Sequence, residues 1–171
     1  MQQTILALGA LMIITMISVN QQHSYYGVME NAYIREVENA AYDYSVMRME
    51  AIVNSTAFDE SVVGSSDPVD VGSLANPAQL GADIGESDLM DFDDLDDFHT
   101  FQEDVQHVLS ADTFRFSVDY EVRYVNLSDL DAIQSSPTLA KELTIKVVSQ
   151  DSIGTKVARF TGTKIAIGLN N

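Results

Sequence analysis

The sequence predicts an α+β fold, in which a long N-terminal α-helix packs on the antiparallel β-sheet of a globular head. Two observations support this prediction. Residues 1–54 contain no proline and follow a helical pattern, whereas several runs after residue 112 alternate apolar and polar side chains, as half-buried strands do. Residues 61–112 connect the two parts and form an acidic loop region.

The first 29 residues carry no charged side chain, and Ile5–Val19 is almost continuous hydrocarbon. A cleaved secretory signal has a basic start and small residues at its cleavage site, and this segment has neither. A membrane-spanning helix needs about 20 apolar residues, so the run spans a bilayer when its uncharged neighbours contribute. The same surface also suits burial among identical copies.

Residues 1–25 are therefore predicted to be a hydrophobic helix that is covered by lipid or by identical copies of the chain. The residues expected to make the assembly contacts are Met1, Ile5, Leu6, Leu8, Leu11, Met12, Ile13, Ile14, Met16 and Ile17.

Residues 26–60 continue as the amphipathic half of the same helix. A helix of about 50 residues is about 75 Å long, and a head of about 115 residues has a radius of gyration of only about 13 Å. The head therefore covers only part of the rod. Apolar residues three and four positions apart form one stripe, and those predicted to pack on the head are Tyr26, Met29, Tyr33, Val37, Ala40, Tyr44 and Met47.

The connecting region changes character along its length. Glycine, serine and proline between residues 61 and 85 predict a long loop, and an acidic run begins at Glu86. Apolar residues recur there at every third position (Leu89, Phe92, Leu95 and Phe98), which predicts a short helix or turn packed by its aromatic side, with carboxylates on the outer face.

Crowded carboxylates can bind a hard cation such as Ca²⁺, although the spacing does not match an EF-hand loop. The other reading is a solvated acidic surface with no bound ion. The candidate calcium ligands are Asp91, Asp93, Asp94, Asp96 and Asp97.

Residues 113–171 form the predicted sheet. The run 113–125 alternates strictly, the run 142–149 places Leu143, Ile145 and Val147 on one face, and the run 155–167 is a third strand or two shorter ones. Short linkers favour an antiparallel meander. One face of such a sheet needs a cover, and the amphipathic half of the helix supplies it.

Composition excludes several classes of function. With 9 basic and 26 acidic residues the chain has a formal net charge of −17, so it lacks the positive patch that nucleic-acid binding needs. There are no cysteines for disulfides or thiol chemistry. The three histidines are scattered and no catalytic or nucleotide-binding motif occurs. We therefore expect a protein that is not an enzyme and needs no cofactor, apart from the calcium considered above.

The charge-free segment MQQTILALGALMIITMIS, its amphipathic continuation and the β-rich head together resemble a mature type IV pilin or pseudopilin. The resemblance implies a homo-oligomeric, extracellular helical filament for attachment or motility. It also implies a pilus assembly machinery, and that residues 1–25 anchor the chain in the inner membrane before assembly and form the filament core afterwards. In that family a short basic leader is removed and the new first residue is N-methylated, a role that Met1 would fill.

Ile5 departs from the family pattern. Family members usually have glutamate at this position, which is thought to pair with the amino terminus of the neighbouring subunit. Its absence favours a first alternative, a minor pilin or pseudopilin of a secretion or DNA-uptake machine. A second alternative is a membrane-tethered module whose acidic face binds calcium or a partner protein.

Overall fold

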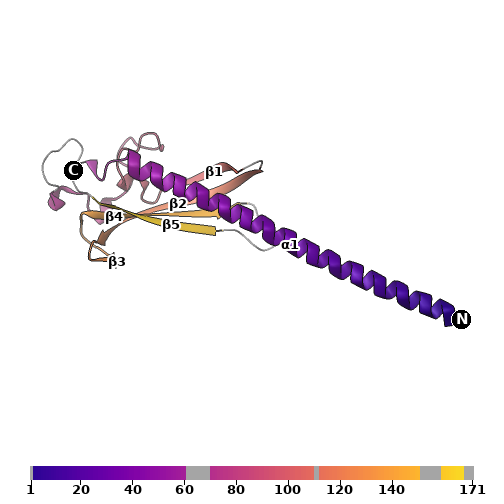
Figure 1. Ribbon diagram of the computed structural model, residues 1–171. Coiled ribbons are helices and arrows are strands. Elements are labelled where there is room, and N and C mark those ends of the chain that lie inside the picture. Colours follow the sequence, from indigo (N-terminus) through magenta and orange to yellow (C-terminus); the bar gives the residue numbers. More distant parts are fainter. Residues whose placement is uncertain (1, 61–69, 110–111, 151–158, 168–171) are drawn as a thin grey trace.

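A computed structural model describes residues 2–60, 70–109, 112–150 and 159–167. Helix α1 (Gln2–Ser55) is one continuous rod whose second half lies along the head and whose first half projects away from it (Figure 1). The helix ends at Ser55, one residue after the helical pattern of residues 1–54 and five residues before the predicted bound at residue 60. Its length follows from the absence of proline, because proline would remove a helical hydrogen bond and clash with the preceding turn.

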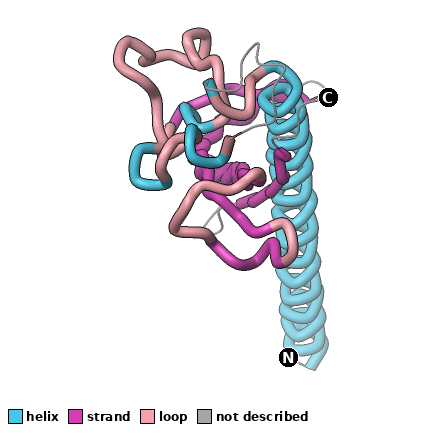
Figure 2. The backbone as a smooth tube through the Cα atoms, turned by 90° about the vertical axis from the view of Figure 1, so that its left-hand side faces the viewer, coloured by secondary structure: helices cyan, strands magenta, loops and turns pink. Residues whose placement is uncertain are grey.

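The head contains a five-stranded sheet in which all pairings are antiparallel. The strand order is β1-β2-β4-β5, and β3 pairs with the end of β2. Helix α1 runs along one side of the head and extends beyond it (Figure 2). The predicted α+β arrangement is confirmed. The strand bounds are β1 Gln102–Leu109, β2 Asp112–Asn126, β3 Asp129–Ile133, β4 Ala140–Ser149 and β5 Arg159–Ile167.

The alternation of β2 and β4 places apolar side chains between the sheet and α1. In the register of the two strands, Val122 lies opposite Leu143 and Tyr120 lies opposite Ile145. These inward positions are buried, as the sequence predicts. The buried strand residues of this core are Phe114, Phe116, Val118, Tyr120, Val122, Leu143, Ile145 and Val147.

Part of the predicted helix stripe faces the sheet. Val37, Ala40 and Tyr44 are buried, and Tyr33 is partly buried against the same core. Ala40 and Ala41 have no exposed surface, and their small side chains let the helix approach the sheet closely.

Three members of the predicted stripe do not pack on the head. Tyr26 and Met29 are 68% and 53% exposed, because they precede Tyr33, where packing of the helix on the core begins, and Met47 is 53% exposed. Near the end of α1 the buried positions are instead Met49 and Ile52. A straight helix on a twisted sheet keeps contact only if the contact line moves around the helix, whereas the predicted stripe stays on one side.

Two strands were not predicted. Strand β1 falls within the predicted acidic loop region 61–112, and β3 falls within a predicted linker. The inward positions of β1 are Glu103, Val105 and His107, two of which are polar, so the strand lacks the apolar alternation that identifies β2. The third predicted run is β5, whose expected first residues, 155–158, lie outside the described residues.

The described part of the region between α1 and β1 closes one end of the core. It contains three short 3-10 helices, Val71–Ser73, Pro77–Gln79 and Asp96–Phe98. The ring of Phe92 packs edge to face on those of Phe98 and Phe101, with centroids 5.1 Å apart in both cases. The predicted aromatic packing of this region is therefore confirmed: Phe92, Leu95 and Phe98 are buried and Leu89 is partly buried.

Candidate functional site

The first half of α1 is an exposed apolar surface that the head does not cover. The exposed fractions of its large side chains run from 49% at Val19 to 78% at Met16. Met1 lies outside the described residues, so its predicted contact is not placed. The other predicted assembly residues are all exposed: Ile5, Leu6, Leu8, Leu11, Met12, Ile13, Ile14, Met16 and Ile17. A continuous apolar surface of this kind marks an interaction site.

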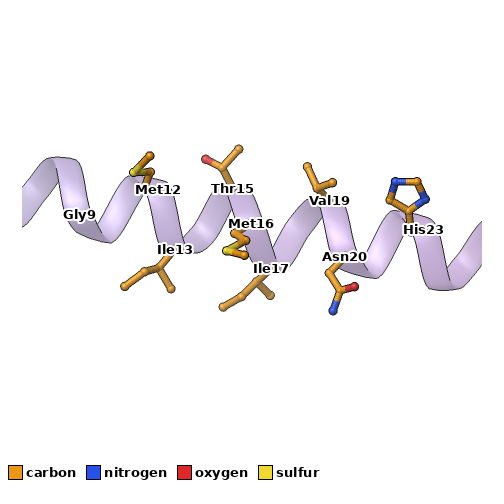
Figure 3. Close-up of a pocket in the computed structure, with 9 residues that line it drawn as sticks. All are labelled: Gly9, Met12, Ile13, Thr15, Met16, Ile17, Val19, Asn20 and His23. Carbon is orange, nitrogen blue, oxygen red and sulfur yellow. The ribbon is translucent and has the colours of Figure 1, made fainter.

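The apolar side chains surround the rod on all sides. Successive residues of an α-helix are about 100° apart, so the consecutive residues 11–14 face every direction. Figure 3 shows Met12 and Val19 on one side of the helix and Ile13 and Ile17 on the opposite side. A helix that is apolar all round is buried within protein or lipid. One docking face would not satisfy this rod, which needs an environment that encloses it.

The composition of the rod suits a bilayer as well as a helical bundle. An 18-residue stretch reaches a mean hydropathy of 1.7, and by length and composition the helix is able to cross a membrane. Thr15 interrupts the apolar surface, but its hydroxyl donates to the carbonyl of Leu11 at 2.7 Å. This hydrogen bond within the helix lowers the cost of removing the hydroxyl from water.

A polar cluster fixes the second half of α1 to the sheet. The hydroxyls of Tyr44 and Tyr120 both donate to Oε1 of Glu103, at 2.8 and 2.5 Å. Arg48 Nε donates to the hydroxyl of Tyr120 at 3.1 Å and lies 3.7 Å from Glu103 Oε1. Burial, together with the carboxylate, raises the pKa of Tyr44 to about 12, so this hydroxyl stays protonated and able to donate. The cluster joins α1, β1 and β2 and thereby sets the direction in which the rod leaves the head.

The acidic run is largely buried, in contrast to the predicted solvated face. Asp94, Asp96 and Asp97 are 5%, 6% and 5% exposed, whereas Asp91 and Asp93 are exposed. Chain geometry explains the difference, because these carboxylates accept hydrogen bonds from backbone amides of the turn. Oδ2 of Asp97 accepts from the amides of residues 93 and 94, at 3.1 and 3.0 Å. Asp94 accepts from the amides of residues 60 and 96, both at 2.8 Å.

Lys141 lies at the centre of the buried acids. It is fully buried on β4, and its Nζ lies 2.5 Å from Asp96 Oδ1 and 3.3 Å from Asp59 Oδ2. The same nitrogen donates to the carbonyl of Phe58 at 2.7 Å and lies 4.8 Å from the centre of that ring. We call Lys141, Asp59, Asp94 and Asp96 the lysine centre.

Protonation reduces the negative charge of the lysine centre. Burial, the side-chain hydrogen bond with Asp96 and the charge of Asp96 together raise the pKa of Asp94 to about 8. At neutral pH Asp94 therefore holds a proton, which its hydrogen bond with Asp96 also requires. Burial likewise raises the pKa of Asp97 to about 6, although its backbone hydrogen bonds oppose the shift.

Four of the five predicted calcium ligands are divided between two groups of acidic residues, and calcium binding by either group stays a prediction. Asp94 and Asp96 belong to the lysine centre, where the ammonium of Lys141 already supplies the positive charge. Asp93 and Asp97 lie with Glu86 in a second group, with their oxygens within 4.8 Å of one another. Asp91 is in neither group. The second group is therefore the better candidate for a cation, because it contains no ammonium.

Sequence reasoning missed Lys141, Asp59 and Glu86. The signal for Lys141 was present, because it stands in phase with Leu143 and Ile145 on the inward face of the strand. A lysine at such a position needs acidic partners in the core. Asp59 and Glu86 carried no comparable signal, since the chain path of the loop brings them to the cluster.

No protein-family model, curated protein or solved structure matches this chain. The functional argument therefore rests on the uncovered apolar rod and the geometry of the head.

Proposed function

We propose that the chain is the structural subunit of an extracellular type IV pilus-like filament that serves attachment or motility. The observation that carries the proposal is the apolar half of α1, exposed around its whole circumference and continuous with a half that is fixed to the head. The resemblance of the N-terminal segment to type IV pilins points the same way. Lipid encloses the rod before assembly, and neighbouring rods enclose it in the filament.

Filament growth needs a contact that repeats without closing. A heterologous contact between identical subunits produces an open helix of copies when its rotation does not close a ring. Transfer of the rod from lipid to a bundle gains little hydrophobic free energy, since both surroundings are apolar. Side-chain packing, contacts between heads and an assembly motor therefore drive polymerisation.

Registration of the subunits differs from the family pattern in this proposal. Ile5 offers no carboxylate to a neighbouring amino terminus. The relative position of two rods then depends on how their apolar side chains interlock and on contacts between heads. The heads carry most of the net charge of −17, so we expect counterions to screen repulsion between them.

Electron microscopy of material sheared from the cell surface tests the proposal. Antibodies against the head identify the chain in the sheared fraction and along any fibres. We expect regular labelling along the whole length of long, thin fibres. Retention of the chain in the membrane fraction, with fibres absent or unlabelled, would contradict a filament subunit.

A minor pilin or pseudopilin is the second candidate, and Ile5 is the observation that favours it. The same labelling separates the two, because a minor subunit appears at a fibre tip or at isolated points. The membrane-tethered module is supported by the group of Glu86, Asp93 and Asp97. Calorimetric titration with calcium tests that binding. Saturable heat with a rise in melting temperature supports calcium binding, and the absence of both effects excludes it.

A further inference from the structure

Lys141 and Asp96 are placed for covalent reaction. The amine nitrogen lies 2.5 Å from a carboxyl oxygen of Asp96, the lysine is fully buried, and Asp94 is hydrogen-bonded to the same carboxyl group. We propose that Lys141 Nζ and Asp96 Cγ join in an intramolecular isopeptide bond, with Asp94 acting on the Asp96 carboxyl group as a hydrogen-bonding acid. The proposal does not depend on filament assembly.

Burial keeps water away from the reacting pair. Lys141 is fully buried, and its Nζ donates to the carbonyl of Phe58 as well as to the carboxylates of Asp59 and Asp96. The reaction starts from this ion pair and requires one proton to pass from the ammonium to Asp96. The rings of Phe58 and Tyr124 flank the nitrogen at 4.8 and 5.4 Å and shield it from solvent.

Asp94 is the group that favours attack on Asp96. Its pKa of about 8 keeps it protonated at neutral pH, so its hydroxyl can donate to an oxygen of the Asp96 carboxyl group. This donation draws electron density from Cγ and stabilises negative charge that develops on the oxygen during attack. The amide of residue 96 and the amide of residue 60 hold the carboxyl group of Asp94 in place.

The reaction is a condensation that needs no other reactant. A proton passes from the Lys141 ammonium to the Asp96 carboxylate, and the freed lone pair of Nζ attacks Cγ and forms the C–N bond. The C–OH bond of the tetrahedral intermediate then breaks, and the hydroxyl leaves as water with a proton from the nitrogen. The products are one amide and one water molecule. Fixed proximity of the two groups replaces the activation that amide formation otherwise requires.

Asp96 is the expected partner in preference to Asp59. Its oxygen lies nearer to the amine than that of Asp59, which is at 3.3 Å. Asp59 also accepts a hydrogen bond from the amide of Ala75 at 3.1 Å. The resulting bond would connect β4 to the turn before β1, between residues 45 positions apart in the sequence. It would hold the acidic loop on the sheet when the head is pulled or heated.

Intact-mass measurement on the full chain, purified in detergent and denatured before analysis, tests the proposal. The wild type is compared with Lys141→Arg and with Lys146→Arg, so any other modification cancels in the differences. Lys146 is the matched control, because it is on the same strand but half-exposed, 3.1 Å from Asp119. We expect the wild type and Lys146→Arg to lack the mass of one water, and Lys141→Arg to have its full mass.

Two further measurements assign the bond. Tandem mass spectrometry of a protease digest should give a branched peptide joined between residues 96 and 141. Asp94→Ala should slow the reaction, so that chains of full mass accumulate. If the wild type has its full mass, Lys141 and Asp96 form only an ion pair, and the proposal is overturned. Water loss that persists in Lys141→Arg, or a branch at Asp59, would also overturn it, and complete reaction in Asp94→Ala would remove the role of Asp94.

Discussion

Lys141 occupies a position on β4 that the alternation of the strand gives to an apolar side chain. A charged group at such a depth is stable only when partners replace its water shell. The carbonyl of Phe58 and the carboxylates of Asp59 and Asp96 provide that replacement. The fold of the loop therefore depends on one buried lysine more than on the many acidic residues around it.

Lys141→Met should lower the free energy of unfolding of the head by about 3–5 kcal/mol, because it removes the lysine to which the buried carboxyl groups of Asp59 and Asp96 are joined. Unfolding followed by circular dichroism in detergent measures the change. Lys146→Met is the matched control and should cost about 0–1 kcal/mol, since its ion pair is exposed. Equal effects of the two substitutions would show that the buried lysine has no special role.

Asp97 should make the head less stable as the pH rises from about 4 to about 6. Its folded-state pKa is about 6 against an ordinary value of 3.8, so in this interval the folded chain binds more protons than the unfolded chain. The stabilisation from protonation is present at low pH and is lost as the pH passes 6. Unfolding free energies measured at intervals from pH 4 to pH 8 check this slope.

Asp97→Asn isolates this contribution. The amide oxygen of asparagine can accept the same two backbone hydrogen bonds, and its NH₂ group can donate to Glu86. The variant should have a flatter pH profile between pH 4 and 6 than the wild type. An unchanged profile would assign the slope to other groups.

Helix α1 and the sheet make the core through small as well as large side chains. Ala40 and Ala41 have no exposed surface and lie among Phe114, Phe116 and the aliphatic side chains of β2 and β4. Residues of this size leave no room for extra methylene groups in a well-packed core. The cluster of Glu103, Tyr44 and Tyr120 then fixes the helix in direction.

Ala40→Leu should destabilise the head by about 1–3 kcal/mol, because the added side chain forces the helix away from the sheet. Ala32→Leu makes the same change at an exposed position of the same helix, and we expect a change within about 0.5 kcal/mol there. Chemical unfolding of both variants provides the comparison. Equal stabilities would indicate that α1 is not seated closely on the sheet.

The elements predicted from the sequence are those with strong periodic patterns. The rod has no proline and β2 alternates over its whole length, so both were predicted close to their observed bounds. Strand β1 was missed because Glu103 and His107 take inward positions, where Glu103 accepts a hydrogen bond from Tyr44 and His107 packs on the ring of Tyr44. Local spacing does not encode such pairings between distant segments.

The candidate site likewise has features that the sequence predicts and features that it does not. Exposure of Ile5 through Ile17 was predictable, because the length of the rod exceeds what the head can cover. The splitting of the acidic run was not, since it depends on where Lys141 arrives from β4. Burial of Asp94 and Asp97 is likewise a result of the turn, in which backbone amides collect around the carboxylates.

At the scale of the whole molecule, the chain consists of a compact head and an apolar rod that projects from it (Figure 1). The head buries the apolar face of its sheet against the second half of α1, whereas the apolar first half of α1 stays exposed. The assembly that we propose completes the burial of the rod with copies of itself, whereas a simple anchor would leave it in lipid. A substitution that stays apolar distinguishes these two surroundings.

Ile13→Ala should weaken the fibres while leaving the membrane-inserted subunit intact. Alanine is apolar and favours the helix, but in a packed bundle the lost side chain leaves a cavity that costs about 2–5 kcal/mol per subunit. The temperature at which sheared fibres dissociate into monomers measures this loss. Ile84→Ala, at a fully exposed position of the head, is the matched control and should not change that temperature. Identical dissociation temperatures would place Ile13 outside any packed bundle.

The central claim is that rods of many copies enclose one another, and helical reconstruction of the surface fibres by electron microscopy tests it most directly. We expect continuous rod-like helical density along the fibre axis, with the β-sheet heads forming an outer shell. Fibres built from other proteins, with this chain remaining in the membrane after shearing, would contradict the claim.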